Sequence, residues 1–144
     1  MCANRPDIRK TSSAEVARHL EDALLSELRS TSEQGRNTQI TLEIRGDDND
    51  LLGGLIGSTS YGWLLIKVLW VDKAFRNLGY GRDLVERAIR HANLDGCHSV
   101  WLDTSDENAR QFYQKLGFDQ FGMLENMSGS HPEKHRRYFL EKRI

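Results

Sequence analysis

The chain has only two cysteines and two prolines among its 144 residues. Cys2 and Cys97 have neither the spacing of metal ligands nor the number that a disulfide framework needs. The sequence therefore predicts no metal site. Free cysteines of this kind favour a reducing compartment, with the cytoplasm as the expected location. We expect Cys97 to be a small buried apolar residue rather than a nucleophile.

Long apolar runs and an excess of one charge are also missing. The longest apolar stretch, Trp63 to Val71, is interrupted by Lys67 and falls far short of the roughly 20 residues that a membrane helix needs. The N-terminal segment MCANRPDIRK contains no apolar signal-peptide core. Twenty basic and 21 acidic residues give a net charge of -1, which argues against a general nucleic-acid binder. We expect neither a membrane nor a nucleic acid as partner.

Apolar spacing and end signals predict three helices within a single domain over residues 1–144. Ser12 starts a capping-box pattern and is expected to cap the first helix, whose apolar residues recur at every fourth position. The second helix should cover about residues 81–93. The third should cover about residues 106–116, with Ser105 or Asp106 as its cap.

Six further segments alternate or form short apolar runs, as strands do. The second helix would join two of them as a parallel pair with a right-handed crossover. The expected fold class is α/β in the mixed α+β sense, with a mainly antiparallel central sheet flanked by helices. The strands are expected at residues 38–45, 51–58, 63–71, 97–103, 118–124 and 137–143.

The most informative segment runs from Leu69 to Gly81. A buried strand ends near Asp72, and Arg-x-x-Gly-x-Gly then leads into a helix. Gly79 and Gly81 remove Cβ atoms where backbone must approach a ligand closely. The first amides of a helix lack intrahelical acceptors, so this turn can cradle a phosphate or pyrophosphate. An ordinary glycine-containing turn is the alternative, whereas the P-loop and Rossmann patterns do not match.

A second segment, residues 106–118, carries a tyrosine at the edge of an apolar helical face. Ala109, Phe112 and Leu116 share that face. Tyr113 lies beside them, so its ring can pack while its hydroxyl points into a cleft. The alternative for Tyr113 is an aromatic residue at the edge of the core with a satisfied hydroxyl.

Together these segments resemble the GNAT superfamily of acyl-CoA-dependent N-acyltransferases. The resemblance rests on Leu-x-Val-x-x-x-x-Arg-x-x-Gly-x-Gly at 69–81, followed by Ala-x-x-x-Tyr-x-Lys-x-Gly-Phe at 109–118. Leu-Asp-Thr at 102–104 and Tyr-Phe-Leu-x-Lys at 138–142 are similar to a branch of small bacterial members.

The resemblance implies that the central strand splays from its parallel neighbour after a bulge, and that the pantetheine arm of the co-substrate acetyl-CoA lies in the gap. It implies that Tyr113 can act as general acid toward the departing thiolate. The chain departs from the family pattern at Lys73, where proline is common, at Asn77, where glycine is common, and at Asp106, where asparagine is common. The implied cofactor-binding residues are Leu69, Trp70, Val71, Arg76, Asn77, Leu78, Gly79, Tyr80, Gly81, Arg82 and Asn108.

The resulting hypothesis is acetyl transfer from acetyl-CoA to a primary amine of a small molecule, by direct attack in a ternary complex. A protein lysine or N-terminal amine as acceptor, or a non-catalytic acyl-CoA-binding module, are the alternatives. Dimerisation through the terminal strands or a helix face is compatible with the sequence. His131 and His135 lie in a late loop that is a candidate lining of the acceptor site. A general base is not singled out; the candidates are Glu43, Asp72, Asp103, Glu125 or a water molecule.

Overall fold

A computed structural model describes residues 4–144, so Cys2 lies outside the described residues. The chain divides into two compact units, one ending at Glu33 and the other running from Gln34 to Ile144. No helix among the described residues has the length and apolarity to cross a lipid bilayer.

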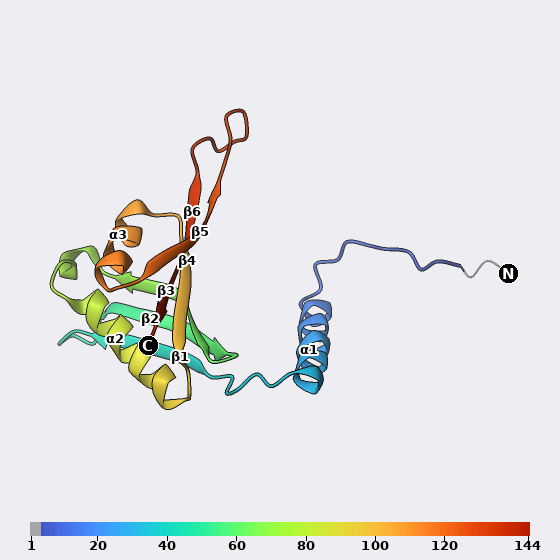
Figure 1. Ribbon diagram of the computed structural model, residues 1–144, viewed down its shortest axis with the longest axis horizontal. Helices are drawn as coiled ribbons and strands as arrows, with labels where there is room; N and C mark the ends of the chain where they lie inside the picture. The colour runs from blue at the N-terminus through green and yellow to red at the C-terminus, as the bar shows by residue number, and fades with distance from the viewer. Residues whose placement is uncertain (1–3) are drawn as a thin grey trace. The chain divides into compact units, whose positions relative to one another are not determined.

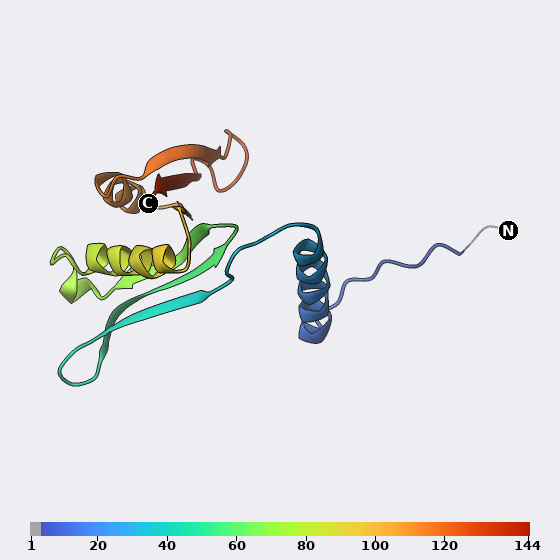
Figure 2. The ribbon, with the colours of Figure 1, turned by 60° about the horizontal axis from the view of Figure 1, so that its bottom comes forward.

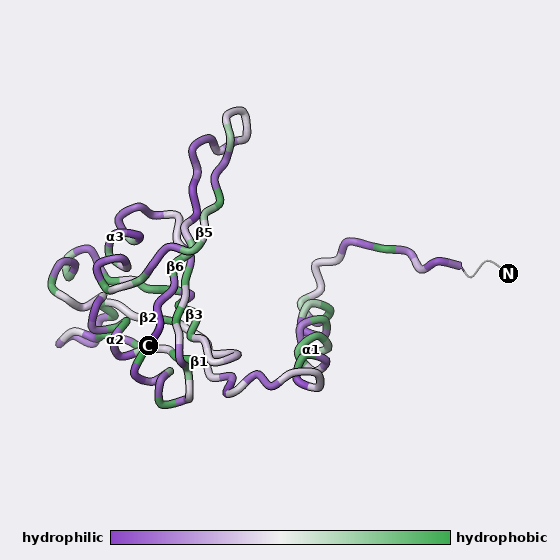
Figure 3. The backbone as a smooth tube through the Cα atoms, viewed as in Figure 1, coloured by the Kyte–Doolittle hydropathy of each residue, from purple (hydrophilic) through white to green (hydrophobic). Residues whose placement is uncertain are grey.

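The first unit contains one amphipathic helix, α1 (Ala14–Thr31). Its cap is Ser13, not the predicted Ser12: the Ser13 hydroxyl accepts a hydrogen bond from the Val16 amide at 3.2 Å. The helix begins one residue later than the sequence pattern suggested, because Ser13 still has the extended backbone of an N-cap residue and its hydroxyl reaches the Val16 amide. Figure 3 shows apolar and polar residues alternating around α1, and none of its residues is buried.

The second unit is built on a six-stranded sheet with the strand order β1-β2-β3-β4-β6-β5 (Figure 1). Its only parallel neighbours among the described residues are β3 and β4, which confirms the mixed, mainly antiparallel sheet predicted from the sequence. The strands are β1 (Gln39–Arg45), β2 (Leu51–Ser60), β3 (Trp63–Val71), β4 (Ser99–Thr104), β5 (Asp119–Glu125) and β6 (Arg136–Arg143).

Two helices of this unit, α2 (Tyr80–Leu94) and α3 (Glu107–Lys115), pack side by side on one face of the twisted sheet (Figure 2). They lie close together because Gly81 has no side chain: a Cβ there would lie 3.3 Å from the Phe112 ring. The core between helices and sheet comes from alternate strand residues and from the inner helix faces. Its buried members include Leu55, Leu64, Ile66, Val85, Ala88, Val100, Leu102, Tyr113 and Leu140.

A bulge in β3 changes which of its residues face this core. Ile56 of β2 pairs with Val68 and Gly57 pairs with Ile66, so Lys67 is the extra residue. Leu64 and Ile66 are buried before the bulge, whereas Leu69 and Val71 pack against the core after it.

Pairing between β3 and β4 stops just before the bulge. The parallel register contains Trp63 with Ser99, Leu64 with Val100, and Leu65 with Trp101, and no later pair. Both strands continue beyond this point, β3 to Val71 and β4 to Thr104. The two strands therefore part, as the family resemblance implied.

The assignment of Leu64 to the core can be tested by mutation. Leu64 is fully buried, whereas Leu94 at the end of α2 is 78% exposed. Replacing Leu64 by alanine should lower the free energy of unfolding by about 2–5 kcal/mol, because it leaves a cavity in the core. Leu94→Ala is the matched control and should change it by less than about 0.5 kcal/mol. Urea unfolding followed by tryptophan fluorescence measures both. Equal losses in the two variants would contradict the assigned core.

Candidate functional site

A groove of about 420 Å³ lies between the end of β3, the loop before α2 and the start of α3. We call it the β3–α3 groove. Every cofactor-binding residue predicted from the sequence lines it except Leu78, whose side chain is 66% exposed. Its lining also includes Phe75, Asp106, Ala109 and Phe112. The fold thus brings two motifs that are distant in sequence to one surface.

The loop before α2 takes its shape from two residues with left-handed backbone, Asn77 with φ 62° and Gly79 with φ 91°. Asparagine tolerates this region better than other residues that carry a side chain. Asn77 can therefore adopt this conformation at the position where the resemblance implied glycine. A Cβ added to Gly79 would meet no atom within 4 Å, so the space above this residue is open.

Positive electrostatic potential collects at the same turn. Gly79 caps α2 without a side-chain hydrogen bond, and the first intrahelical bond runs from the Asp83 amide to the Gly79 carbonyl at 3.0 Å. The amides of the first turn before Asp83 consequently have no helical acceptor. Arg76 anchors the loop, since its Nε donates to the Val71 carbonyl at 2.8 Å. The groove can hold an anion on backbone N–H groups, with Arg76 and Arg82 in its lining; Arg82 is paired with Glu86 at 2.9 Å.

The strand wall of the groove offers backbone groups as well. Leu69, Trp70 and Val71 lie beyond the last pair that joins β3 to β4. Their edge on the β4 side is free for pairing with an extended ligand chain.

The helix wall begins with a capped turn. The Asp106 carboxylate accepts from the Asn108 amide at 3.0 Å and so starts α3. Asp106 and Asn108 both line the groove. The chain thus has an aspartate at the position where the resemblance implies asparagine, and an amide side chain two residues later on the same surface.

Tyr113 lies further along α3 than Asn108, and it does not line the groove. It is 5% exposed, and its ring makes edge contacts with Phe112 at 5.0 Å and Phe118 at 5.3 Å between centroids. Burial raises the pKa of its hydroxyl above the usual value, so Tyr113 stays protonated at neutral pH.

The hydroxyl of Tyr113 is nevertheless not fully buried. None of the side-chain hydrogen bonds found among residues 4–144 involves it. No fully buried side-chain oxygen or nitrogen in that range lacks a hydrogen-bond partner. An unbonded hydroxyl must then have exposed surface, and Tyr113 combines an apolar environment with a proton that no protein group accepts.

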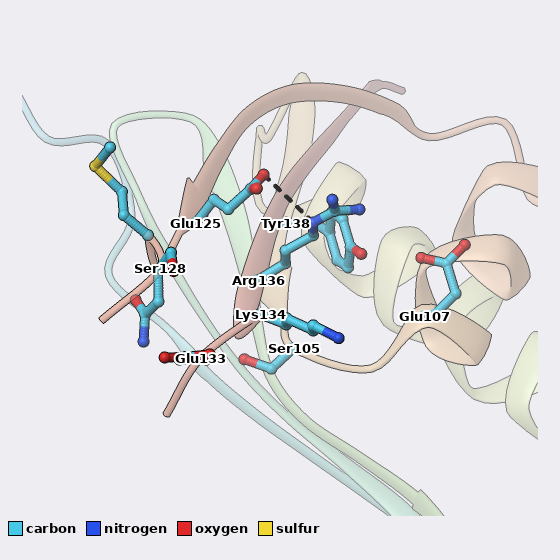
Figure 4. A pocket seen from close by; sticks show the side chains of 10 residues that line it. Ser105, Glu107, Glu125, Ser128, Glu133, Lys134, Arg136 and Tyr138 are labelled. Carbon is cyan, nitrogen blue, oxygen red and sulfur yellow. Dashed lines mark ion pairs between the residues drawn. The ribbon is translucent and has the colours of Figure 1, made fainter. Parts of the chain in front are cut away.

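A second cavity, of about 770 Å³, lies between the start of α3 and the β5–β6 hairpin (Figure 4). We call it the hairpin cavity. It shares one wall with the β3–α3 groove: Ser105 and Glu107 line the cavity, whereas Asp106, Asn108 and Ala109 line the groove. We call Asp106–Ala109 the dividing turn. The remaining lining residues are Glu125, Asn126, Met127, Ser128, Glu133, Lys134, Arg136 and Tyr138.

A three-residue cluster ties the dividing turn to β6. The Arg110 guanidinium donates two hydrogen bonds to Glu107, one of them from Nε at 2.8 Å, and lies 5.0 Å from the centre of the Tyr138 ring. The pKa of Glu107 is lowered to about 2, chiefly by the Arg110 hydrogen bond, with Gln111 and the Tyr138 hydroxyl adding to it. Sequence reasoning missed Glu107 and Tyr138 as site residues, because only the fold brings them together.

Most other candidates from the sequence lie outside both cavities. Glu125 lines the hairpin cavity but is paired with Arg136 at 3.3 Å. Asp103 pairs with Arg137, and Asp72 caps the short 3-10 helix η1 (Lys73–Phe75). The hairpin cavity is not lined by the loop residues His131 and His135, nor by Glu43. Cys97 is buried as predicted, and burial raises the pKa of its thiol.

Comparisons with known proteins agree with this geometry. A family model described as the acetyltransferase (GNAT) family matches residues 8–118. The chain is 31% identical over 115 residues to acetyltransferase Atu2258 from Agrobacterium fabrum, covering 80% of this chain and 84% of that protein. It is 38% identical over 74 residues to blasticidin-S acetyltransferase from Streptomyces morookaense, covering 51% of this chain and 54% of that protein.

A similar backbone occurs in a crystal structure of an acetyltransferase from Agrobacterium tumefaciens. The TM-score is 0.84 at 28% identity, over 97% of this chain and 99% of that one. The chain belongs to the acetyltransferase (GNAT) family.

Proposed function

We propose that this acetyltransferase transfers the acetyl group of acetyl-CoA to a primary amine of a small molecule, with both substrates bound at once. The observation that carries the proposal is the parting of β3 and β4 beside a groove whose loop presents unbonded helix amides. An extended chain ending in a pyrophosphate fits both features, since one offers strand backbone and the other an anion cradle.

The residues of the groove suit acetyl-CoA in detail. Leu69 and Val71 would pair with the amide groups of the pantetheine arm, and the turn Arg76–Gly81 would hold the pyrophosphate, with Arg82 and Asn108 at its sides. When bound, acetyl-CoA supplies an acetyl group activated as a thioester. The open space above Gly79 is where a phosphate oxygen can approach the backbone.

The chemistry needs a neutral amine and a proton for the leaving sulfur. The amine nitrogen attacks the acetyl carbon, so a C–N bond forms, the C–S bond breaks and the sulfur leaves with the bonding electrons. Tyr113 donates its proton to that sulfur and regains one from the nitrogen through solvent, which leaves an amide and a thiol. The raised pKa of Tyr113 keeps this proton in place at neutral pH.

The hairpin cavity is where the acceptor would bind. It adjoins the groove across the dividing turn, so an amine entering there approaches the end of the groove without crossing the cofactor site. The likeness to blasticidin-S acetyltransferase supports a small molecule as acceptor. A peptide amine is the competing acceptor, and binding without transfer is the competing activity.

Calorimetric titration with acetyl-CoA and an assay of thiol release separate these alternatives. The acceptor panel would hold simple alkylamines, benzylamine, amino sugars, blasticidin S and a peptide with a free lysine and N-terminus. Binding together with transfer to a small amine supports the proposal. Transfer to the peptide alone would change the acceptor class, and binding without any transfer would favour an acyl-CoA-binding module.

Three expectations from the sequence stay predictions. A single domain over residues 1–144 is checked by one cooperative unfolding transition, and a homodimer by sedimentation velocity. A cytoplasmic location is checked by cell fractionation.

Gly79 and Gly96 give a matched test of the cofactor loop. Both have φ 91° with open space around the missing Cβ, but Gly79 precedes α2 and Gly96 follows it. Alanine is strained by about 1–2 kcal/mol at such a backbone angle, so each variant loses a similar stability. Only Gly79→Ala redirects the groove amides, and we expect it to raise the Kd of acetyl-CoA about tenfold. Equal Kd values for both variants, by calorimetry, would remove Gly79 from the cofactor site.

Tyr113→Phe tests the general acid. Phenylalanine keeps the ring packing, so kcat should fall about 100-fold while the Kd of acetyl-CoA stays within about twofold. In the native enzyme kcat/KM should rise with pH as the amine loses its proton. It should show no loss through tyrosine ionisation below about pH 10, because the pKa of Tyr113 is raised, not lowered. Tyr61→Phe, at the β2–β3 turn, is the control, and unchanged kcat in Tyr113→Phe would assign the acid elsewhere.

A further inference from the structure

The lining of the hairpin cavity carries five charged side chains, of which three are carboxylates. Glu107 is held by the Arg110 guanidinium. Glu125 pairs with Arg136 at 3.3 Å. The Glu133 carboxylate accepts a hydrogen bond from a backbone amide of its own loop at 3.0 Å. Each carboxylate of the lining therefore already has a donor.

Lys134 carries the remaining charge of the lining. Within the described range, residues 4–144, its ammonium takes part in none of the ion pairs. Figure 4 shows its side chain extended from the hairpin across the cavity, toward Ser105 and Glu107 on the α3 side. A positive charge without a counterion thus faces the space where the acceptor would bind.

The backbone at Lys134 is also unusual. Its φ is 63°, in the left-handed region that residues with a side chain, other than asparagine and aspartate, rarely adopt. Glycine or asparagine would suit this position better if only the turn mattered. A residue in such a conformation, whose charged end reaches into a cavity, is placed for a functional role.

An anionic group on the acceptor is the complement of this charge. An ammonium group donates up to three hydrogen bonds and accepts none, and its bonds to an anion are stronger than those between neutral groups. Ser105 lines the same cavity, and its hydroxyl can donate to the same anion. A second ammonium group on the acceptor would instead be repelled by Lys134.

We propose that Lys134 binds an anionic group of the acceptor, so that the preferred substrates are amines that also carry a carboxylate or a phosphonate. This inference rests on the proposed function, because it names the acceptor class of the same enzyme. Lys134 takes no part in bond making, and its contact with the anion is the same before and after transfer. Losing that contact therefore raises KM for the acidic amine rather than lowering kcat.

The test compares benzylamine with derivatives that add one anionic group. These are phenylglycine, 4-(aminomethyl)benzoate and the phosphonate analogue of phenylglycine. The two carboxylates differ in their distance from the amine, and the phosphonate distinguishes the two kinds of anion. We expect the native kcat/KM for the best acidic amine to exceed that for benzylamine about tenfold. This advantage should shrink as salt is added, because salt screens the attraction.

Lys134→Gln removes the charge with little change in length. We expect the ratio of kcat/KM between the best acidic amine and benzylamine to fall about tenfold, through KM, and to lose its salt dependence. Lys134→Arg keeps the charge and should keep most of the ratio. Lys115→Gln, at the exposed end of α3 and outside both cavities, is the matched control and should leave the ratio unchanged.

Lys134→Asn separates the charge from the backbone. Asparagine is neutral and tolerates a φ of 63°, so the unfolding midpoint should not fall, while the ratio should drop as in Lys134→Gln. A native ratio in Lys134→Asn would make any loss in Lys134→Gln a structural effect and overturn the proposal.

The outcomes distinguish this inference from the function beneath it. If the native enzyme acetylates benzylamine but prefers none of the acidic amines, or if Lys134→Gln keeps the native ratio, the anion-binding role is overturned and the proposed function stands. If the native enzyme acetylates none of these amines and none of the panel above, the proposed function itself fails.

Discussion

The parting of β3 from β4 is the constraint on which the site depends. One extra residue, Lys67, shifts the pleat of β3, and the parallel pairing ends just before it. From there the strand turns Leu69 and Val71 toward the core and leaves its edge toward β4 free. A continuous ladder would have satisfied those backbone groups and closed the groove. The end of β3 leads directly into the loop and the first turn of α2. The free strand edge and the helix amides therefore line the same groove.

The dividing turn converts this gap into two adjoining sites. Successive residues on a helix point about 100° apart, so Glu107 faces the hairpin cavity while Asn108 faces the groove. Asp106 caps the turn, and Arg110 one turn later ties Glu107 to Tyr138 on β6. Under the proposed function, the dividing turn would let two substrates approach each other from separate entrances. Rigid positioning of that kind supplies much of the rate of a two-substrate reaction.

Two tyrosines near the site, Tyr113 and Tyr138, have opposite surroundings. Tyr113 is packed between Phe112 and Phe118, and its environment disfavours the ionised form. Tyr138 lies beside the ion pair of Arg110 with Glu107, and the guanidinium lies over its ring. Desolvation keeps Tyr113 protonated at neutral pH, whereas Tyr138 lies against charged side chains. The same residue type thus meets two environments, because burial and neighbouring charges differ at the two positions.

Local signals determined much of this protein from sequence alone. The strand Trp63–Val71, the helix after Gly79 and the loop residues Arg76–Gly81 follow from apolar runs, backbone preferences and free helix amides, which act within a few residues. The tertiary structure decided the cap at Ser13, the exclusion of Leu78 from the groove, the depth of Tyr113 and the meeting of Glu107 with Tyr138. Those features depend on strand register and on packing between distant segments. No short-range pattern encodes them, because the energy that fixes them comes from contacts made only after the chain has folded.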